Sequence, residues 1–169
     1  MKKLAALSML SLLAAGAAVA QSDSAVLEKF VTQSRPICER QPAQKCVDAF
    51  WGYADVDRDG GLNLSEVERI RSVTESWVVE NGKTLHPKDR SSIVMGIMMV
   101  DSAGLPTLFK NYDLNGDSKL SQQELLADVK LDSRPLPQIL ADRNAVDMQA
   151  SKRKLGALGP LLDGMLARR

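Results

Sequence analysis

Apolar residues recur along this chain at the spacing of one helix face. Residues 24–34 show the pattern and predict a first helix. We expect that helix to end at Arg35-Pro36, because the residue before a proline avoids the α region. Further helices are predicted over 42–54 and over 87–100, the latter with a proline at its first position. The pattern therefore predicts an all-α fold.

The same apolar face occurs twice, at an offset of 58 residues. Apolar residues lie 8, 5, 4 and 1 positions before Asp55 and again before Asp113, so two predicted helices enter acidic segments with the same phase. These eight residues are Val47, Phe50, Trp51, Ala54, Leu105, Leu108, Phe109 and Tyr112. The chain therefore contains an internal repeat.

A helix is also predicted after each acidic segment. The first exit helix should end near Asn81-Gly82, a pair suited to a helix C-terminus. The second should continue through Leu125 and Val129 before Pro135 interrupts the chain. Each acidic segment thus joins two helices, and the repeat is a helix–loop–helix unit.

The predicted helix over 87–100 is apolar nearly all round from residue 93 onward. Eight apolar residues are too few to span a bilayer. We favour a buried core helix. The alternative is an apolar groove lined by Met95, Met98 and Met99 that accepts a helix of a protein partner.

The acidic segments carry the oxygen ligands that calcium requires. Calcium takes six to eight oxygens, and a loop of twelve residues supplies them from positions 1, 3, 5, 7, 9 and 12. Residues 55–66, the first acidic loop, and residues 113–124, the second acidic loop, fit this scheme with two ions. The ligands are Asp55, Asp57, Asp59, the Gly61 carbonyl, Asn63 and Glu66 in the first, and Asp113, Asn115, Asp117, the Lys119 carbonyl, Ser121 and Glu124 in the second.

These two units resemble the EF-hand family, and the resemblance covers roughly half of the chain after residue 20. It implies a helix–loop–helix pair whose loops can join in a short β bridge at position 8, occupied by Leu62 and Leu120. The 46 residues between Glu66 and Asp113 leave open whether the loops face each other.

The second acidic loop departs from the family pattern at position 6. Gly60 holds that position in the first loop, whereas Ser118 holds it in the second. A left-handed turn at Ser118 would cost about 1–2 kcal/mol. The second loop also has three carboxylates against four in the first. We therefore predict that the first loop binds calcium more tightly.

The two ends of the chain predict its organisation. Residues 1–20 have the layout of a bacterial secretory signal peptide, with Lys2 and Lys3, an apolar stretch and a small-residue cut after Ala20; a membrane anchor is the less favoured reading. Residues 21–134 would form the EF-hand domain, with a stapled N-terminal helix. Residues 135–169 would form a helical tail, whose leucines lie near one face over 152–166 between basic ends.

Export would place the two cysteines in an oxidising compartment, where we predict a disulfide between Cys38 and Cys46. Free redox thiols are the weaker alternative, because the spacing is not C-x-x-C. We favour the periplasm, with secretion to the medium as the alternative.

The sequence predicts binding chemistry rather than catalysis. His86 is the only histidine, and no set of reactive residues converges on it, so we expect no enzyme. Without Lys2 and Lys3 the chain has 20 basic and 21 acidic residues, which does not favour a nucleic-acid partner.

Three roles remain open for the bound calcium and the tail. The ion would switch a binding module that contacts a protein through the apolar groove. In the alternative, it would stabilise or buffer without switching. The basic tail would otherwise lie in the groove or touch a membrane, and we favour membrane contact least because its glycines interrupt an amphipathic helix.

Overall fold

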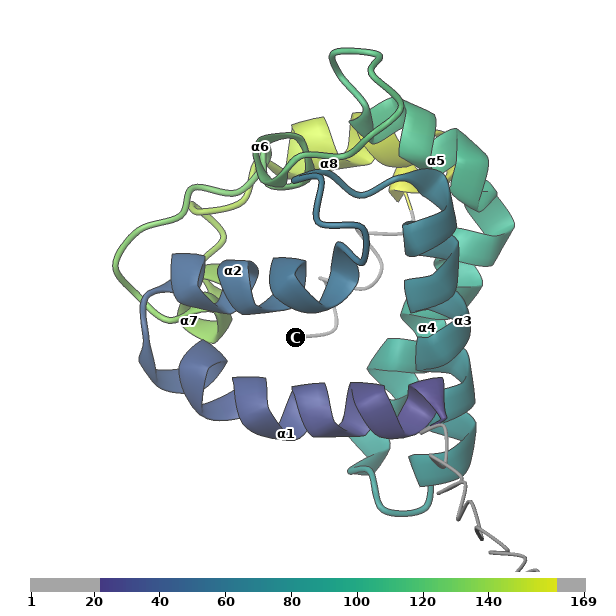
Figure 1. The fold of residues 1–169 in the computed structure, drawn as a ribbon. Helices are drawn as coiled ribbons and strands as arrows, with labels where there is room; N and C mark the ends of the chain where they lie inside the picture. The colour runs from purple at the N-terminus through teal and green to yellow at the C-terminus, as the bar shows by residue number, and fades with distance from the viewer. Residues whose placement is uncertain (1–21, 161–169) are drawn as a thin grey trace, which may run out of the picture.

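The structure is a computed structural model that describes residues 22–160, and helices dominate this part of the chain, as the all-α prediction requires (Figure 1). The predicted signal peptide and the end of the tail from residue 161 lie outside the described residues. The elements are α1 (Asp23–Arg40), α2 (Ala43–Ala54), α3 (Leu64–Asn81), α4 (Pro87–Ala103), α5 (Leu105–Tyr112), α6 (Gln122–Leu125), α7 (Leu136–Ala141), α8 (Met148–Leu155) and the 3₁₀ turn η1 (Gly156–Leu158).

Helix α1 is longer than its sequence predicts. Ser22 caps its start by accepting a hydrogen bond from the Ala25 amide. The helix then runs through Pro36 to Arg40, so the predicted end at Arg35-Pro36 is wrong. A proline inside a helix costs about 3 kcal/mol. Contacts of α1 with α2, α3 and α7 offset this cost, and the extra turn places Cys38 beside α2.

The cysteine pair joins α1 to α2. Cys38 and Cys46 form a disulfide with their Cα atoms 4.6 Å apart. Farther along, the rings of Phe30 and Tyr53 stack with centroids 4.6 Å apart. The two helices therefore form a hairpin that is fixed at its turn by the disulfide and at its open end by aromatic packing.

Helix α3 crosses α1 and encloses the first apolar core. Leu27 of α1 packs against Val73, Trp77 and Val78 of α3, all buried. The Trp77 indole Nε1 donates to Glu28 Oε2 at 2.5 Å, which satisfies the one polar atom of that ring. Burial of side chains of this size stabilises a fold by about 1.5–3 kcal/mol each. These contacts hold α3, and with it the end of the first acidic loop.

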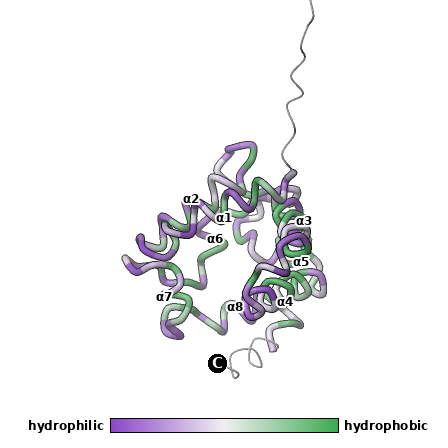
Figure 2. The backbone as a smooth tube through the Cα atoms, turned by 90° about the horizontal axis from the view of Figure 1, so that it is seen from below, coloured by the Kyte–Doolittle hydropathy of each residue, from purple (hydrophilic) through white to green (hydrophobic). Residues whose placement is uncertain are grey.

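Helix α4 is exposed, and the prediction of a buried core helix is wrong. None of its residues is buried, and Met95 and Met98 are 45% and 63% exposed. Only one side meets α3, where Ile93 reaches the first core and Asp101 accepts two hydrogen bonds from Arg71. Figure 2 shows hydrophobic residues along this helix. Its other side therefore presents apolar surface outward within the described chain.

The helix after the second acidic loop is a single turn. Helix α6 ends at Leu125, so the prediction that it continues through Val129 is wrong. Residues 128–130 instead pair with 145–147: the Lys130 amide donates to the Ala145 carbonyl at 2.7 Å, and the Asp147 amide to the Asp128 carbonyl at 2.7 Å. This pairing takes the backbone groups that a longer helix would have used.

The tail packs onto the rest of the molecule. Ile139 of α7 is buried with Ala43 and Ala145 in a second core. Helix α8 begins at Met148, within the predicted helical tail, and stops at Gly156, whose φ of +58° ends the helix. It lies beside α5, where the Asn111 side-chain Nδ2 donates to the Lys154 backbone carbonyl at 2.8 Å. The rest of the predicted stretch over 152–166 lies partly outside the described residues.

Among the described residues, no single helix has the length and apolar character to cross a membrane. The pair α4 and α5 meets that test only jointly, across a bend of 88°.

Candidate metal centre

The two acidic loops lie side by side. The Leu62 amide donates to the Leu120 carbonyl at 2.9 Å, and the Leu120 amide donates to the Leu62 carbonyl at 2.8 Å, which makes an isolated antiparallel bridge. Both leucine side chains are buried between the helices that enter the loops, against Trp51, Ala54 and Phe109. The backbone and the core therefore fix the position of each loop relative to the other.

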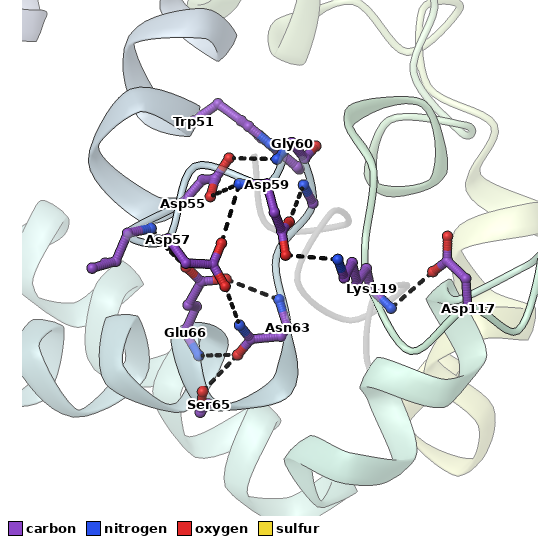
Figure 3. A network of polar contacts seen from close by, with 12 residues as sticks. Trp51, Asp55, Asp57, Asp59, Gly60, Asn63, Ser65, Glu66, Asp117 and Lys119 are labelled. Atoms are coloured by element: carbon purple, nitrogen blue, oxygen red, sulfur yellow. Dashed lines mark hydrogen bonds and ion pairs between the residues drawn. The ribbon is translucent and has the colours of Figure 1, made fainter.

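The first acidic loop turns its carboxylates inward. Carboxylate oxygens of Asp55, Asp57 and Asp59 lie within 4.8 Å of one another. Backbone amides hold them there: the Asp59 amide donates to Asp55 Oδ1 and to Asp57 Oδ1 at 3.2 Å, and the Gly60 amide donates to Asp55 Oδ2 at 3.0 Å. The Trp51 side chain of α2 also holds the loop at Gly60, because its Nε1 donates to the Gly60 carbonyl at 3.2 Å (Figure 3).

Glu66 closes the first acidic loop from the start of α3. Its carboxylate is buried and accepts from the amides of Val56 and Asp57 at 2.6 and 3.3 Å and from the Asn63 amide at 3.0 Å. Asn63 in turn caps α3, since its Oδ1 accepts from the Glu66 amide at 3.0 Å. This reciprocal pair is a capping box. One glutamate thus joins the first turn of the helix to the opposite end of the loop.

The second acidic loop repeats this arrangement position by position. Glu124 accepts from the amides of Leu114 and Asn115 at 2.9 and 3.2 Å and from the Ser121 amide at 2.9 Å, and Ser121 caps α6. The Asp117 and Ser118 amides donate to the two oxygens of Asp113 at 3.1 and 3.0 Å. The two loops thus share one hydrogen-bonding plan despite their different sequences.

Left-handed backbone occurs at the same two positions of each loop. Positions 4 and 6 have positive φ, with Arg58 at +59° and Gly60 at +93° in the first loop and Gly116 at +74° and Ser118 at +64° in the second. Ser118 therefore takes the left-handed turn, and the strain of a side chain in that conformation applies to the second loop. Each loop pairs one glycine with one residue that has a side chain, and the glycine sits at position 6 only in the first.

Electrostatics differ among the carboxylates. Partial desolvation raises the pKa of Asp57, and the nearby charges of Asp59 and Glu66 raise it further. A hydrogen bond from Lys119 lowers the pKa of Asp59. Backbone and side-chain hydrogen bonds from Ser121, with those from the Asn115 and Leu114 amides, lower the pKa of Glu124. Negative charge is thus concentrated in the first loop, where one ammonium group partly balances it.

The residues predicted as calcium ligands all lie on these two loops. In the first, the three aspartates converge. In the second, the Asn115 side-chain amide donates to Asp117 Oδ2 at 2.9 Å, so an amide stands where the first loop has Asp57. The donor set is made of oxygens, which fits a hard cation such as calcium. His86 is not part of it; its Nδ1 accepts from the Lys88 amide at the exposed start of α4.

Two features were not predicted from the sequence. The capping boxes could have been predicted, because Asn63 and Ser121 are each followed three residues later by a glutamate. The ion pair between Lys119 Nζ and Asp59 Oδ2, at 2.6 Å, joins residues 60 positions apart and depends on how the loops pair. It has no signal in the sequence alone.

Comparisons of this chain with protein-family models, with curated proteins and with solved structures give no match. The chemistry of the two acidic loops is therefore the basis for assigning a function.

Proposed function

We propose that this protein binds two calcium ions, one in each acidic loop. The observation that carries the proposal is the repeated plan of the loops: in both, the position-12 glutamate is buried and reaches back to the amides of positions 2 and 3. A carboxylate held at that place is the closing ligand of a twelve-residue calcium loop. The resemblance to EF-hand loops supports the same assignment.

The first acidic loop would bind through the carboxylates of positions 1, 3, 5 and 12. Like charges within 4.8 Å repel one another, and a divalent cation relieves that repulsion. The carbonyls of Gly61 and Lys119 would supply the position-7 ligands of the two sites. Asn63 and Ser121 would ligate at position 9, directly or through water.

Isothermal titration calorimetry of residues 21–169 tests the proposal. Calcium is expected to bind with a stoichiometry of two, and a matched titration with magnesium controls for non-specific attraction to acidic loops. Glu66→Gln and Glu124→Gln should each remove one site and leave the other. Absence of a calcium heat in the wild-type protein would contradict the proposal.

We further propose that calcium makes this protein a responsive binding module with a protein partner. Two observations support it. The exposed side of α4 offers Met95 and Met98. An almost wholly apolar cavity of about 280 Å³ is lined by Phe50 and Trp51 of α2 and by Leu125 of α6, all next to the loops. A shift of the loops on binding calcium would therefore reach apolar surface directly.

A stabilising role without a switch is the second candidate. The raised pKa of Asp57 favours it, because carboxylates that interact unfavourably are stabilised by a bound cation. Fluorescence of an apolar dye distinguishes the roles. Dye binding that rises with calcium supports the switch, whereas a higher melting temperature with unchanged dye binding supports stabilisation alone.

We propose that the protein acts in the periplasm, with secretion as the alternative. The disulfide between Cys38 and Cys46 is compatible with an oxidising, exported location. Fractionation of cells that produce the full chain tests this: we expect a product shortened by twenty residues in the periplasmic fraction.

A further inference from the structure

Lys119 belongs to the second acidic loop, but its side chain ends on the first. Its Nζ lies 2.6 Å from Asp59 Oδ2, and no other ion pair between described residues joins the two loops (Figure 3). Asp59 holds position 5 of the first loop. The same carboxylate that would ligate calcium is therefore already paired with a cation from the neighbouring site.

The backbone directs the lysine to this place. Gly61 directly precedes Leu62 and Lys119 directly precedes Leu120, so both residues flank the bridge that joins the two loops. An ideal Cβ on Gly61 would lie 2.9 Å from Lys119 Cβ and 3.2 Å from its Cδ. The missing side chain of Gly61 thus makes room for the lysine stem to cross the first loop. The position of the ammonium follows from the pairing of the loops.

This contact changes the charge balance of the two sites. The first loop has four carboxylates and the second has three. The ammonium on Asp59 offsets part of the additional negative charge of the first site. The carboxylate advantage of the first loop is therefore reduced as long as Lys119 stays in place.

We propose that Lys119 is an internal competitor that lowers the calcium affinity of the first acidic loop. This inference rests on the proposed function. A calcium ion that takes Asp59 as a ligand must share that carboxylate with the ammonium or displace it, and the two cations repel each other. The backbone carbonyl of Lys119 is the position-7 ligand of the second site, so one residue acts on both sites. Its ammonium group lowers the calcium affinity of the first site, and its backbone carbonyl ligates calcium at the second.

Calorimetry of Lys119→Met tests the inference. Its first site should bind calcium about three- to tenfold more tightly than the wild-type site, the size expected when a unit charge near a divalent ion is removed in surroundings close to water. Because exposed charges are screened, the gain should shrink as salt is raised from 0.02 to about 0.5 M. The Glu124→Gln background, which lacks the second site, isolates the first-site affinity.

Two control variants separate charge from packing. Lys119→Arg keeps the charge and should bind like the wild type. Lys110→Met removes an exposed charge of α5 and should change the affinity by less than about twofold. Circular dichroism verifies that each variant is folded; Lys119 is partly exposed, so its replacement should leave the helices intact.

The outcomes distinguish this inference from the proposed function. Calcium heat in the wild type with unchanged affinity in Lys119→Met overturns the inference and leaves the proposed function standing. An equal gain in Lys119→Arg also overturns it, because charge would not be the cause. Absence of calcium heat in every variant overturns both.

Discussion

Lys154 and Asp128 form a buried ion pair that fastens the tail to the second helix–loop–helix unit. Lys154 Nζ lies 3.1 Å from Asp128 Oδ1, and the two side chains are only 11% and 8% exposed. The ammonium also lies 4.5 Å from the centroid of the Tyr112 ring, directly before the second acidic loop. The lysine of α8 thus contacts residues on both sides of the second acidic loop.

Loss of this lysine should destabilise the protein strongly. Lys154→Met leaves Asp128 as a buried carboxylate without its cation, and breaking a buried pair from one side costs about 3–5 kcal/mol. The double variant Lys154→Met/Asp128→Leu should recover much of that loss, because no unpaired charge remains. Urea unfolding followed by circular dichroism measures both.

Lys45→Met provides the control for this pair, since Lys45 is exposed on α2. It should change the free energy of unfolding by less than about 0.5 kcal/mol. If Lys45→Met and Lys154→Met lowered the free energy of unfolding equally, the buried ion pair would contribute no more to stability than an exposed lysine.

Ser118→Gly should stabilise the second acidic loop. Ser118 has φ +64°, and a left-handed residue with a side chain costs about 1–2 kcal/mol relative to glycine. Part of that gain is lost to the greater entropy of glycine in the unfolded chain, so we expect about 0.5–1 kcal/mol. Thermal unfolding without calcium measures it. Ser118→Ala keeps the Cβ and should give no gain; equal effects of the two variants would contradict the strain argument.

The two position-12 glutamates test the ranking of the sites. Glu66→Gln and Glu124→Gln each remove one bidentate ligand, and each should weaken its own site by more than about tenfold, or 1.4 kcal/mol. Four carboxylates against three predict that Glu66→Gln causes the larger loss of total calcium affinity. Lys119 reduces this difference, so the ranking should be clearest in the Lys119→Met background. A larger loss from Glu124→Gln in that background would reverse it.

The elements near the loops were the most predictable part of this fold. The apolar phase before Asp55 predicted α2, and Asn81-Gly82 marked the end of α3, because these signals act within a few residues. The candidate ligands were readable for the same reason: their chemistry depends on spacing inside twelve residues. The departure of Ser118 from the glycine of position 6 was readable in the same way, and the structure gives it left-handed backbone.

What the sequence failed to predict depends on contacts between distant segments. Pro36 is a local stop signal, but α1 continues past it to Arg40, where the disulfide of Cys38 joins the last turn to α2. The pairing of residues 128–130 with 145–147 replaces a helix that local propensity favours. Helix α4 has a core-like composition but lies at the surface, because hydrophobicity does not say which neighbour will cover a helix.

Reduction of the disulfide should loosen the hairpin of α1 and α2. Cys38 and Cys46 are eight residues apart, and in the loop-entropy account so small a ring contributes about 2–3 kcal/mol. The double variant Cys38→Ser/Cys46→Ser should lose that amount in urea unfolding without calcium. Adding a thiol reductant should destabilise the wild type equally and leave the double variant unchanged. A reductant effect on the double variant would point to another cause.

Glu124 predicts how stability responds to acid. Hydrogen bonds from Ser121 and from the amides of Asn115 and Leu114 lower the pKa of Glu124 in the folded protein below its ordinary value of about 4.5. A carboxylate with a lower pKa in the folded than in the unfolded chain contributes stability above the unfolded value, and this contribution is lost as pH falls through the folded value. In a chelator, the wild type should therefore be more stable than Glu124→Gln at pH 7, and the gap should close below about pH 4, where protonated Glu124 resembles glutamine. Urea midpoints from pH 7 to pH 3 measure the gap. A gap that stays constant over this range would mean that the glutamine variant loses stability through packing, and that the ionised carboxylate does not hold the loop.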